Sequence, residues 1–222
     1  PGLTLCNARG VHDASTAELA VGLAIASRRG FPEFMREQIA GRWSHHRTSS
    51  LSDSKIGIIG YGSIGKKIAQ NLSGFEVSVT AFTQSGRDGS LTIDQLDSHL
   101  PQLDIVILIL PLSDSSRHLF NAKRLAAMKD GALLINVARG PVVDTDALVA
   151  ELNSGRIYAA LDVTDPEPLP TGHALWSAKN LFLVPHVGGN SDAFEPRGRA
   201  LVESQLKLLA AGSPLEHVVA QG

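Results

Sequence analysis

The sequence predicts an α/β protein with a doubly wound parallel sheet and helices on both faces. Three observations lead to this prediction. Short apolar runs alternate with stretches of helical periodicity from Lys55 onward, and the run from Asp104 to Leu110 is apolar enough to be buried on both faces. In addition, a glycine-rich turn joins the first apolar run to the helical stretch that follows it.

The elements are predicted in chain order. A helix is expected from Asp13 to Ser27 with Asp13 as its cap, and another from Pro32 to Ala40 with Pro32 in its first turn. The polar stretch from Gly41 to Ser54 is typical of a loop. The strands of the sheet are expected at 55–59, 77–82, 104–110, 132–137, 157–163 and 181–184. Further helices are expected near 66–73, 92–99, 121–128 and 144–153, with a terminal helix within 191–211.

The glycine-rich turn is the strongest local signal. In Gly60-Tyr61-Gly62-Ser63-Ile64-Gly65, the first glycine permits a tight turn and the second lets a pyrophosphate approach the backbone. The third lets helix and strand pack closely, and the helix N-terminus faces the phosphates. Strand, turn and helix together predict a Rossmann-type dinucleotide site, whose binding residues are Gly60, Tyr61, Gly62, Ser63, Ile64 and Gly65.

Composition gives no reason to expect several classes of partner. The formal net charge of −2 gives no reason to expect nucleic acid or an anionic membrane. The longest apolar run, Ile105 to Leu110, is too short to span a bilayer, and the N-terminus lacks a signal-peptide pattern.

The adjacent histidines at 45 and 46 lack a suitably spaced partner, so no metal site is predicted. A single cysteine fits a reducing compartment, and we expect a cytoplasmic protein. The chain begins with Pro1, so we expect a processed or truncated product.

The end of the second strand favours NADP over NAD. NAD-binding sites usually carry Asp or Glu at that position, to accept the ribose 2′-hydroxyl. Here Thr83 stands there, and Thr83, Ser85 and Arg87 together are suited to a 2′-phosphate. The alternative is that Arg87 is a solvated loop residue beside Asp88.

Polar segments follow three of the later strands, and each is ambiguous when taken alone. Together with other motifs they resemble the D-isomer-specific 2-hydroxyacid dehydrogenases over nearly the whole chain. The motifs are Thr16-Ala17-Glu18 within Asn7 to Ala20, Pro111 to Arg117 with serines in place of the family's threonines, Val137-Ala138-Arg139-Gly140, Asp162 to Pro168, His173-Ala174-Leu175-Trp176, and Pro185-His186.

The resemblance implies reversible hydride transfer between NAD(P)H and a small 2-oxo acid of the glyoxylate, hydroxypyruvate or phosphoglycerate type. The resemblance thus implies an oxidoreductase acting on a CH–OH group. It also implies that Arg139 binds the substrate carboxylate and polarises the carbonyl, and that His186 exchanges the proton. Glu167 would pair with His186 and favour its charged form, and Asp162 would orient the nicotinamide. Further implied cofactor contacts are Leu110, Pro111, Ser116, Val137, Ala138 and Gly188.

The resemblance also implies a domain division. Residues 1–190 would form the dinucleotide-binding domain, including the helix that enters it and a dimer arm at 13–46. Residues 191–222 would be the C-terminal helix of a substrate domain that is otherwise absent, and that segment is expected to be mobile or repacked. A homodimer is expected through Gly22 to His46. Two alternatives remain: a dinucleotide-sensing regulator of the C-terminal-binding protein type, and another Rossmann enzyme such as formate dehydrogenase, which Glu167 before His186 fits less well.

Overall fold

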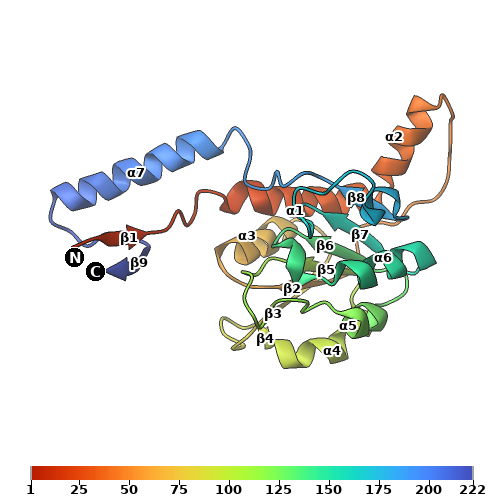
Figure 1. Ribbon diagram of the computed structural model, residues 1–222, viewed down its shortest axis with the longest axis horizontal. Helices are drawn as coiled ribbons and strands as arrows, with labels where there is room; N and C mark the ends of the chain where they lie inside the picture. Colours follow the sequence, from red (N-terminus) through yellow and green to blue (C-terminus); the bar gives the residue numbers. More distant parts are fainter. Residues whose placement is uncertain (1, 222) are drawn as a thin grey trace.

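The computed structural model describes residues 2–221 and confirms the predicted doubly wound α/β fold (Figure 1). Within these residues, seven parallel strands are ordered β4-β3-β2-β5-β6-β7-β8. Their bounds are β2 Lys55–Ile59, β3 Ser78–Thr83, β4 Leu91–Thr92, β5 Ile105–Leu108, β6 Leu133–Asn136, β7 Tyr158–Leu161 and β8 Leu181–Leu183. Within this sheet, the strand that the sequence did not predict is β4, because a strand of two residues is too short to show any periodicity.

Helices cover both faces of this sheet. On one face lie α1 (Asp13–Arg28) and α3 (Ser63–Leu72), and on the other α4 (Leu96–His99), α5 (Ala122–Ala127) and α6 (Thr145–Ser154). The strand β5 shows why the sheet needs both layers. Its Ile105 and Ile107 pack with α1 and α3, while Val106 and Leu108 pack with the opposite layer, and all four are fully buried. Each such side chain contributes about 1.5–3 kcal/mol by burial.

Helix starts differ in part from the predictions. Asp13 does not cap α1: the N-cap is His12, which makes no side-chain cap hydrogen bond, and Asp13 lies in the first turn. An acidic residue there is favourable because it faces the positive end of the helix dipole. The helix predicted at 92–99 is divided into the 3₁₀ turn η1 (Ile93–Gln95) and α4. Further 3₁₀ turns are η2 (Leu100–Gln102), η3 (Gly140–Val142) and η4 (Ala174–Ser177).

Both ends of the described chain form a lobe beside the sheet. The strand β1 (Thr4–Cys6) pairs antiparallel with β9 (Val218–Gln221), and α7 (Phe194–Ala210) lies next to them, apart from the sheet (Figure 1). No residue of α7 is buried. At the opposite end of the molecule α2 (Phe31–Ile39) projects outward, and it has no buried residue either.

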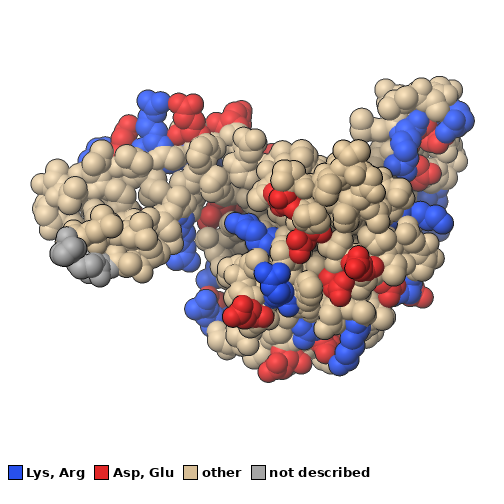
Figure 2. Space-filling model, viewed as in Figure 1, with Lys and Arg blue, Asp and Glu red and all other residues tan. Residues whose placement is uncertain are grey.

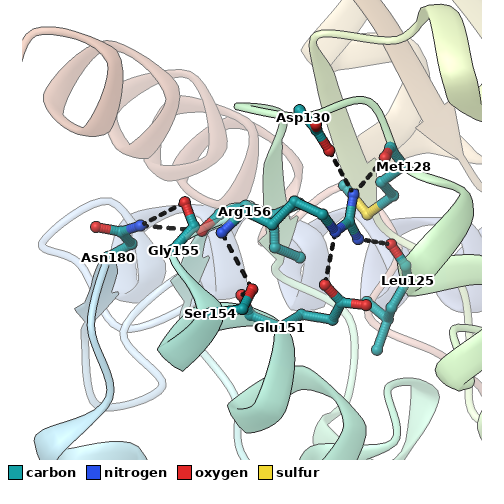
Figure 3. Close-up of polar contacts among 9 residues, drawn as sticks. Leu125, Met128, Asp130, Glu151, Ser154, Gly155, Arg156 and Asn180 are labelled. Carbon is teal, nitrogen blue, oxygen red and sulfur yellow. Dashed lines mark hydrogen bonds and ion pairs between the residues drawn. The ribbon is translucent and has the colours of Figure 1, made fainter.

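Arg156 lies between α6 and β7, just before β7 begins, and its contacts reach the end of α5 (Figure 3). Its guanidinium donates to Glu151 at 2.7 Å, to the Met128 carbonyl at 2.6 Å and to the Leu125 carbonyl. The hydrogen bond to Glu151 raises the pKa of Arg156. These hydrogen bonds hold the end of α5 against the turn between α6 and β7, so Arg156 has a structural role.

The surface has no stripe of a single charge on the face drawn in Figure 2, where blue and red side chains alternate over the body of the molecule. In the described part of the chain, no helix has both the length and the apolar character needed to cross a membrane.

Candidate active site

Two neighbouring cavities lie at the carboxyl ends of the strands. One, of about 330 Å³, is lined by residues that include the glycine turn and the β3 end, and the other, of about 470 Å³, is lined by residues that include Arg139 and His186. Ile109 lines both, so the two cavities adjoin at this residue. Of the predicted site residues, those on the first cavity are Gly60, Tyr61, Gly62, Thr83, Arg87, Leu110, Pro111 and Ser116. Those on the second are Ile64, Val137, Arg139, Asp162, His186 and Gly188. The predicted residues that line neither are Ser63, Gly65, Ala138 and Glu167.

The glycine turn has the geometry of a phosphate cradle. A Cβ on Gly60, whose φ is +103°, would lie 2.1 Å from the Ile109 carbonyl oxygen, and one on Gly65 would lie 2.2 Å from the Gly60 oxygen. A Cβ on Gly62 would meet no atom within 4 Å. Packing therefore requires a glycine at positions 60 and 65, whereas Gly62 leaves open backbone at the N-cap of α3. That opening fits a dinucleotide pyrophosphate.

At the ribose end, a chain of hydrogen bonds orders the loop after β3. The buried Ser90 hydroxyl donates to the Arg87 carbonyl at 2.6 Å, so its single proton is used. The Thr83 hydroxyl, 2.7 Å from Ser90 Oγ, is then the donor of that pair and keeps only acceptor capacity for a ligand. Of the other residues predicted to bind a 2′-phosphate, Arg87 lines the cavity and is exposed, whereas Ser85 does not line it.

The loop after β5 uses Ser116 internally. Its buried hydroxyl donates to the Pro111 carbonyl at 2.8 Å and accepts from the Ser113 backbone N–H at 2.7 Å. Ser116 thus shapes the wall of the cofactor cavity, and its hydroxyl is occupied within the loop. Ser113 and Ser115, which the sequence did not single out, line the same wall.

Asn136 and Gly140 hold the turn that carries Arg139. The buried Asn136 amide donates to the Arg139 carbonyl at 3.0 Å, and its oxygen accepts from the Ala138 N–H at 3.0 Å. A Cβ on Gly140 would lie 1.9 Å from the Thr164 carbonyl oxygen, so the backbone of the next loop touches this turn. The Arg139 guanidinium donates to the adjacent Ala138 carbonyl and lies exposed on the cavity.

Asp162, only 3% exposed, anchors the loop that follows β8. One carboxylate oxygen accepts the Val187 N–H at 2.6 Å and the other the Gly188 N–H at 3.1 Å, and the Asp162 carbonyl accepts the His186 N–H at 2.8 Å. The resemblance implied a role in orienting the nicotinamide. The geometry adds a direct role in placing His186.

His186 and Glu167 are brought together from separate loops. The Nδ1 atom of His186 hydrogen-bonds to Oε1 of Glu167. Because a carboxylate only accepts, the proton lies on Nδ1 and Nε2 is left for a ligand. The backbone of His186 adopts a φ of +53°, an uncommon conformation for a non-glycine residue and one that recurs at functional sites. A histidine and a cation, Arg139, that line the same cavity suit an anionic substrate that is protonated as it reacts.

Sequence reasoning missed the contribution of His12. Its Nδ1 lies 3.2 Å from the Gly189 carbonyl oxygen, and its ring stacks on Phe194 with centroids 5.1 Å apart. The neighbouring Thr16 hydroxyl donates to the Gly188 carbonyl at 3.1 Å. The start of α1 therefore supports the loop of His186, and both His12 and Phe194 line the cavity. This contact joins residues far apart in the chain, so no local pattern indicates it.

Comparisons with known proteins agree with this geometry. The family model for the D-isomer specific 2-hydroxyacid dehydrogenase NAD binding domain matches residues 21–188. A hydroxypyruvate reductase of Thermotoga maritima is 34% identical over 94% of this chain and 71% of its own. A D-isomer specific 2-hydroxyacid dehydrogenase of Xanthobacter autotrophicus, solved with NADPH and MES, superposes with a TM-score of 0.84, 31% identity and coverage of 99% of this chain and 93% of its own.

An NADPH-dependent glyoxylate/hydroxypyruvate reductase of Sinorhizobium meliloti, solved with NADP and malonate, has a TM-score of 0.85 and 32% identity, covering 99% of this chain and 71% of its own. These relatives are named as enzymes and lend no support to the regulatory alternative. The chain belongs to the D-isomer-specific 2-hydroxyacid dehydrogenase family and contains its NAD(P)-binding domain.

Proposed function

We propose that this protein reduces a small 2-oxo acid of the glyoxylate or hydroxypyruvate type, with phosphoglycerate-type acids as the second candidate class. The observation that carries the proposal is that Arg139 and His186 line one cavity, and that this cavity adjoins, at Ile109, the cavity that contains the cradle at Gly62. The names of the relatives support the substrate class, since they include hydroxypyruvate and glyoxylate reductases.

The residues of this chain perform three tasks in the proposed reaction. A bound nicotinamide supplies the hydride that reaches the carbonyl carbon. Arg139 pairs with the substrate carboxylate and polarises the carbonyl. His186 gives the proton on Nε2 to the carbonyl oxygen and takes it back in the oxidative direction, while Glu167 holds Nδ1–H and fixes the ring. Asp162, which directly follows β7, holds the backbone of the loop that carries His186.

For the cofactor, we propose a preference for NADPH over NADH. Two observations support this preference. Position 83 carries a threonine and not a carboxylate, and the Arg87 guanidinium is exposed on the cavity wall. The relatives solved with NADPH or NADP are consistent with it. Titration of each cofactor tests the preference: equal dissociation constants, or tighter binding of NADH, would refute it.

For the assembly, we propose a homodimer formed through α2 and the segment after it. Four large apolar side chains of this arm are exposed: Phe31 50%, Met35 64%, Ile39 85% and Trp43 96%. Such a concentration on a projecting element is typical of a protein interface. Light scattering at micromolar concentration tests it. A Trp43→Ser, Ile39→Ser variant should be monomeric, and a monomeric unsubstituted protein would contradict the dimer.

For the remaining organisation, we propose that residues 191–222 belong to a substrate domain, and that residues 1–190 form the dinucleotide-binding domain. The lobe that contains α7 and β9 supports the second part of this division. The first part does not hold for β1, because that strand pairs with β9 and lies in the same lobe although it falls within residues 1–190. A cytoplasmic location, with neither nucleic acid nor membrane as partner, stays a prediction that cell fractionation tests.

The activity is tested on the full-length natural protein, by following NADPH and NADH absorbance with glyoxylate, hydroxypyruvate and pyruvate. His186→Ala should abolish turnover while NADPH affinity is kept. Retention of more than about a hundredth of the rate would contradict a general acid, whose typical contribution is about 10²–10⁴-fold. Glu167→Gln, which keeps the shape and removes the charge, should lower turnover with the same cofactor affinity.

A further inference from the structure

An ion pair lies next in the chain to Arg87, a residue of the cofactor cavity, although neither partner lines that cavity itself. Lys66 Nζ is 2.8 Å from Asp88 Oδ2. Lys66 directly follows Gly65 of the glycine turn, and Asp88 directly follows Arg87, the cation on the cavity wall. The pair therefore connects the first turn of α3 with the loop after β3, on which the adenosine end of the cofactor is expected.

The pair has little to contribute to packing. The side chains of Lys66 and Asp88 are 51% and 49% exposed, and exposed ion pairs add little to the stability of a fold. The hydrogen bond from Lys66 lowers the pKa of Asp88, so the carboxylate is ionised at neutral pH. A full negative charge thus stands next to Arg87, and Lys66 neutralises it.

We propose that Lys66 and Asp88 form a charge gate that sets the selectivity between NADPH and NADH. The gate rests on the proposed cofactor site. The Asp88 carboxylate repels the 2′-phosphate, which NADH lacks, and the Lys66 ammonium cancels that repulsion. The two partners consequently act in opposite directions on the same quantity, the ratio of the NADH and NADPH dissociation constants.

These opposite effects distinguish an electrostatic role of the ion pair from a purely structural one. If the pair only braced the loop after β3, losing either partner would disturb the loop in the same way and lower the selectivity in both cases. If charge is what matters, Lys66→Met exposes the cavity to an uncompensated Asp88, whereas Asp88→Asn leaves Lys66 free to attract the phosphate.

The experiment measures dissociation constants of NADPH and NADH by fluorescence titration for Lys66→Met, Asp88→Asn and the double variant. We expect the NADPH selectivity to fall about threefold to tenfold in Lys66→Met, to rise by a similar factor in Asp88→Asn, and to return close to the unsubstituted value in the double variant. Lys67→Met is the matched control, since Lys67 donates to Gln70 at 2.9 Å and loses the same charge from the same helix. It should leave the ratio nearly unchanged.

Salt provides a second readout. Surface charge effects are screened within about 10 Å at about 0.1 M salt, so the opposite shifts should shrink between about 20 mM and about 0.5 M salt. Shifts of the same sign in the two single variants, or shifts that salt leaves unchanged, would overturn the gate. Equal affinity of the unsubstituted protein for both cofactors would refute the proposed NADPH preference, while opposite shifts of the ratio would still support the gate.

Discussion

Gly140 lies directly against the backbone of Thr164, so close that a Cβ on the glycine would be 1.9 Å from the Thr164 carbonyl oxygen. The contact joins two loops with different proposed tasks. One carries Arg139, and the other leads to Glu167, the partner of His186. The spacing between the proposed carboxylate-binding cation and the proposed proton donor is thus set partly by a residue that has no side chain.

Gly140→Ala should separate these loops and lower kcat, with little effect on NADPH affinity, because the glycine turn lies elsewhere. The matched control is Gly74→Ala, at a glycine whose Cβ would meet no atom within 4 Å. Steady-state kinetics together with a cofactor titration checks the prediction. Unchanged kcat in Gly140→Ala would show that the loops tolerate the displacement.

Asp162→Asn should weaken the fold as well as the reaction. Both carboxylate oxygens accept backbone N–H groups, at 2.6 Å from Val187 and 3.1 Å from Gly188, and an amide offers only one acceptor oxygen. We expect a loss of about 1–3 kcal/mol in the free energy of unfolding, measured by urea denaturation without cofactor. Asp165→Asn is the control, since at that residue the carbonyl, not the carboxylate, accepts the bond from Thr145. A role confined to the nicotinamide would leave the stability of the cofactor-free protein unchanged.

The sequence predicted the parallel sheet because the sheet depends on local patterns. Most of the predicted site residues line the two cavities, and their roles in binding and catalysis stay predictions. Apolar runs mark buried strands, and the glycine spacing at Gly60 to Gly65 marks the turn between strand and helix. Contacts between distant segments leave no such pattern. The support that His12 gives to Gly189, the pairing of β1 with β9 and the internal use of the Ser116 hydroxyl all depend on how loops meet in space. The cap expected at Asp13 was wrong by one residue, since the N-cap is His12.

Asp104 should make stability depend on pH in the acid range. Burial raises the pKa of Asp104. Hydrogen bonds from the Lys129 ammonium at 2.6 Å and the Lys55 backbone N–H at 2.8 Å lower it by more than burial raises it, so the net pKa lies below the ordinary value. A group with a depressed folded-state pKa stabilises at pH values above its unfolded pKa, about 3.9, and loses that contribution as pH falls through the folded value. Asp104→Asn should therefore cost about 1–2 kcal/mol at pH 7, and this difference from the unsubstituted protein should shrink below about pH 4.

Urea unfolding at several pH values measures this difference for Asp104→Asn and for Asp114→Asn, an exposed control. A constant difference between pH 7 and the acid limit would show that the charge of Asp104 is not what stabilises the strand start.

His12 offers a test of how the loop of His186 is held, because its two contacts can be removed separately. His12→Phe keeps a ring to stack on Phe194 and loses the Nδ1–H that the Gly189 carbonyl accepts. His12→Asn keeps an N–H donor and loses the ring. If the hydrogen bond positions the loop, His12→Phe should lower kcat about tenfold, and His12→Asn should retain more of it. The loss is smaller than the roughly hundredfold or greater contribution of a general acid, because His186 itself is kept. NADPH affinity should be the same in both, since the glycine turn is untouched.

Amide hydrogen exchange at Gly188 and Gly189 gives a readout that needs no turnover: faster exchange is expected in His12→Phe. Greater damage in His12→Asn than in His12→Phe would instead assign the positioning of His186 to the stack between α1 and α7.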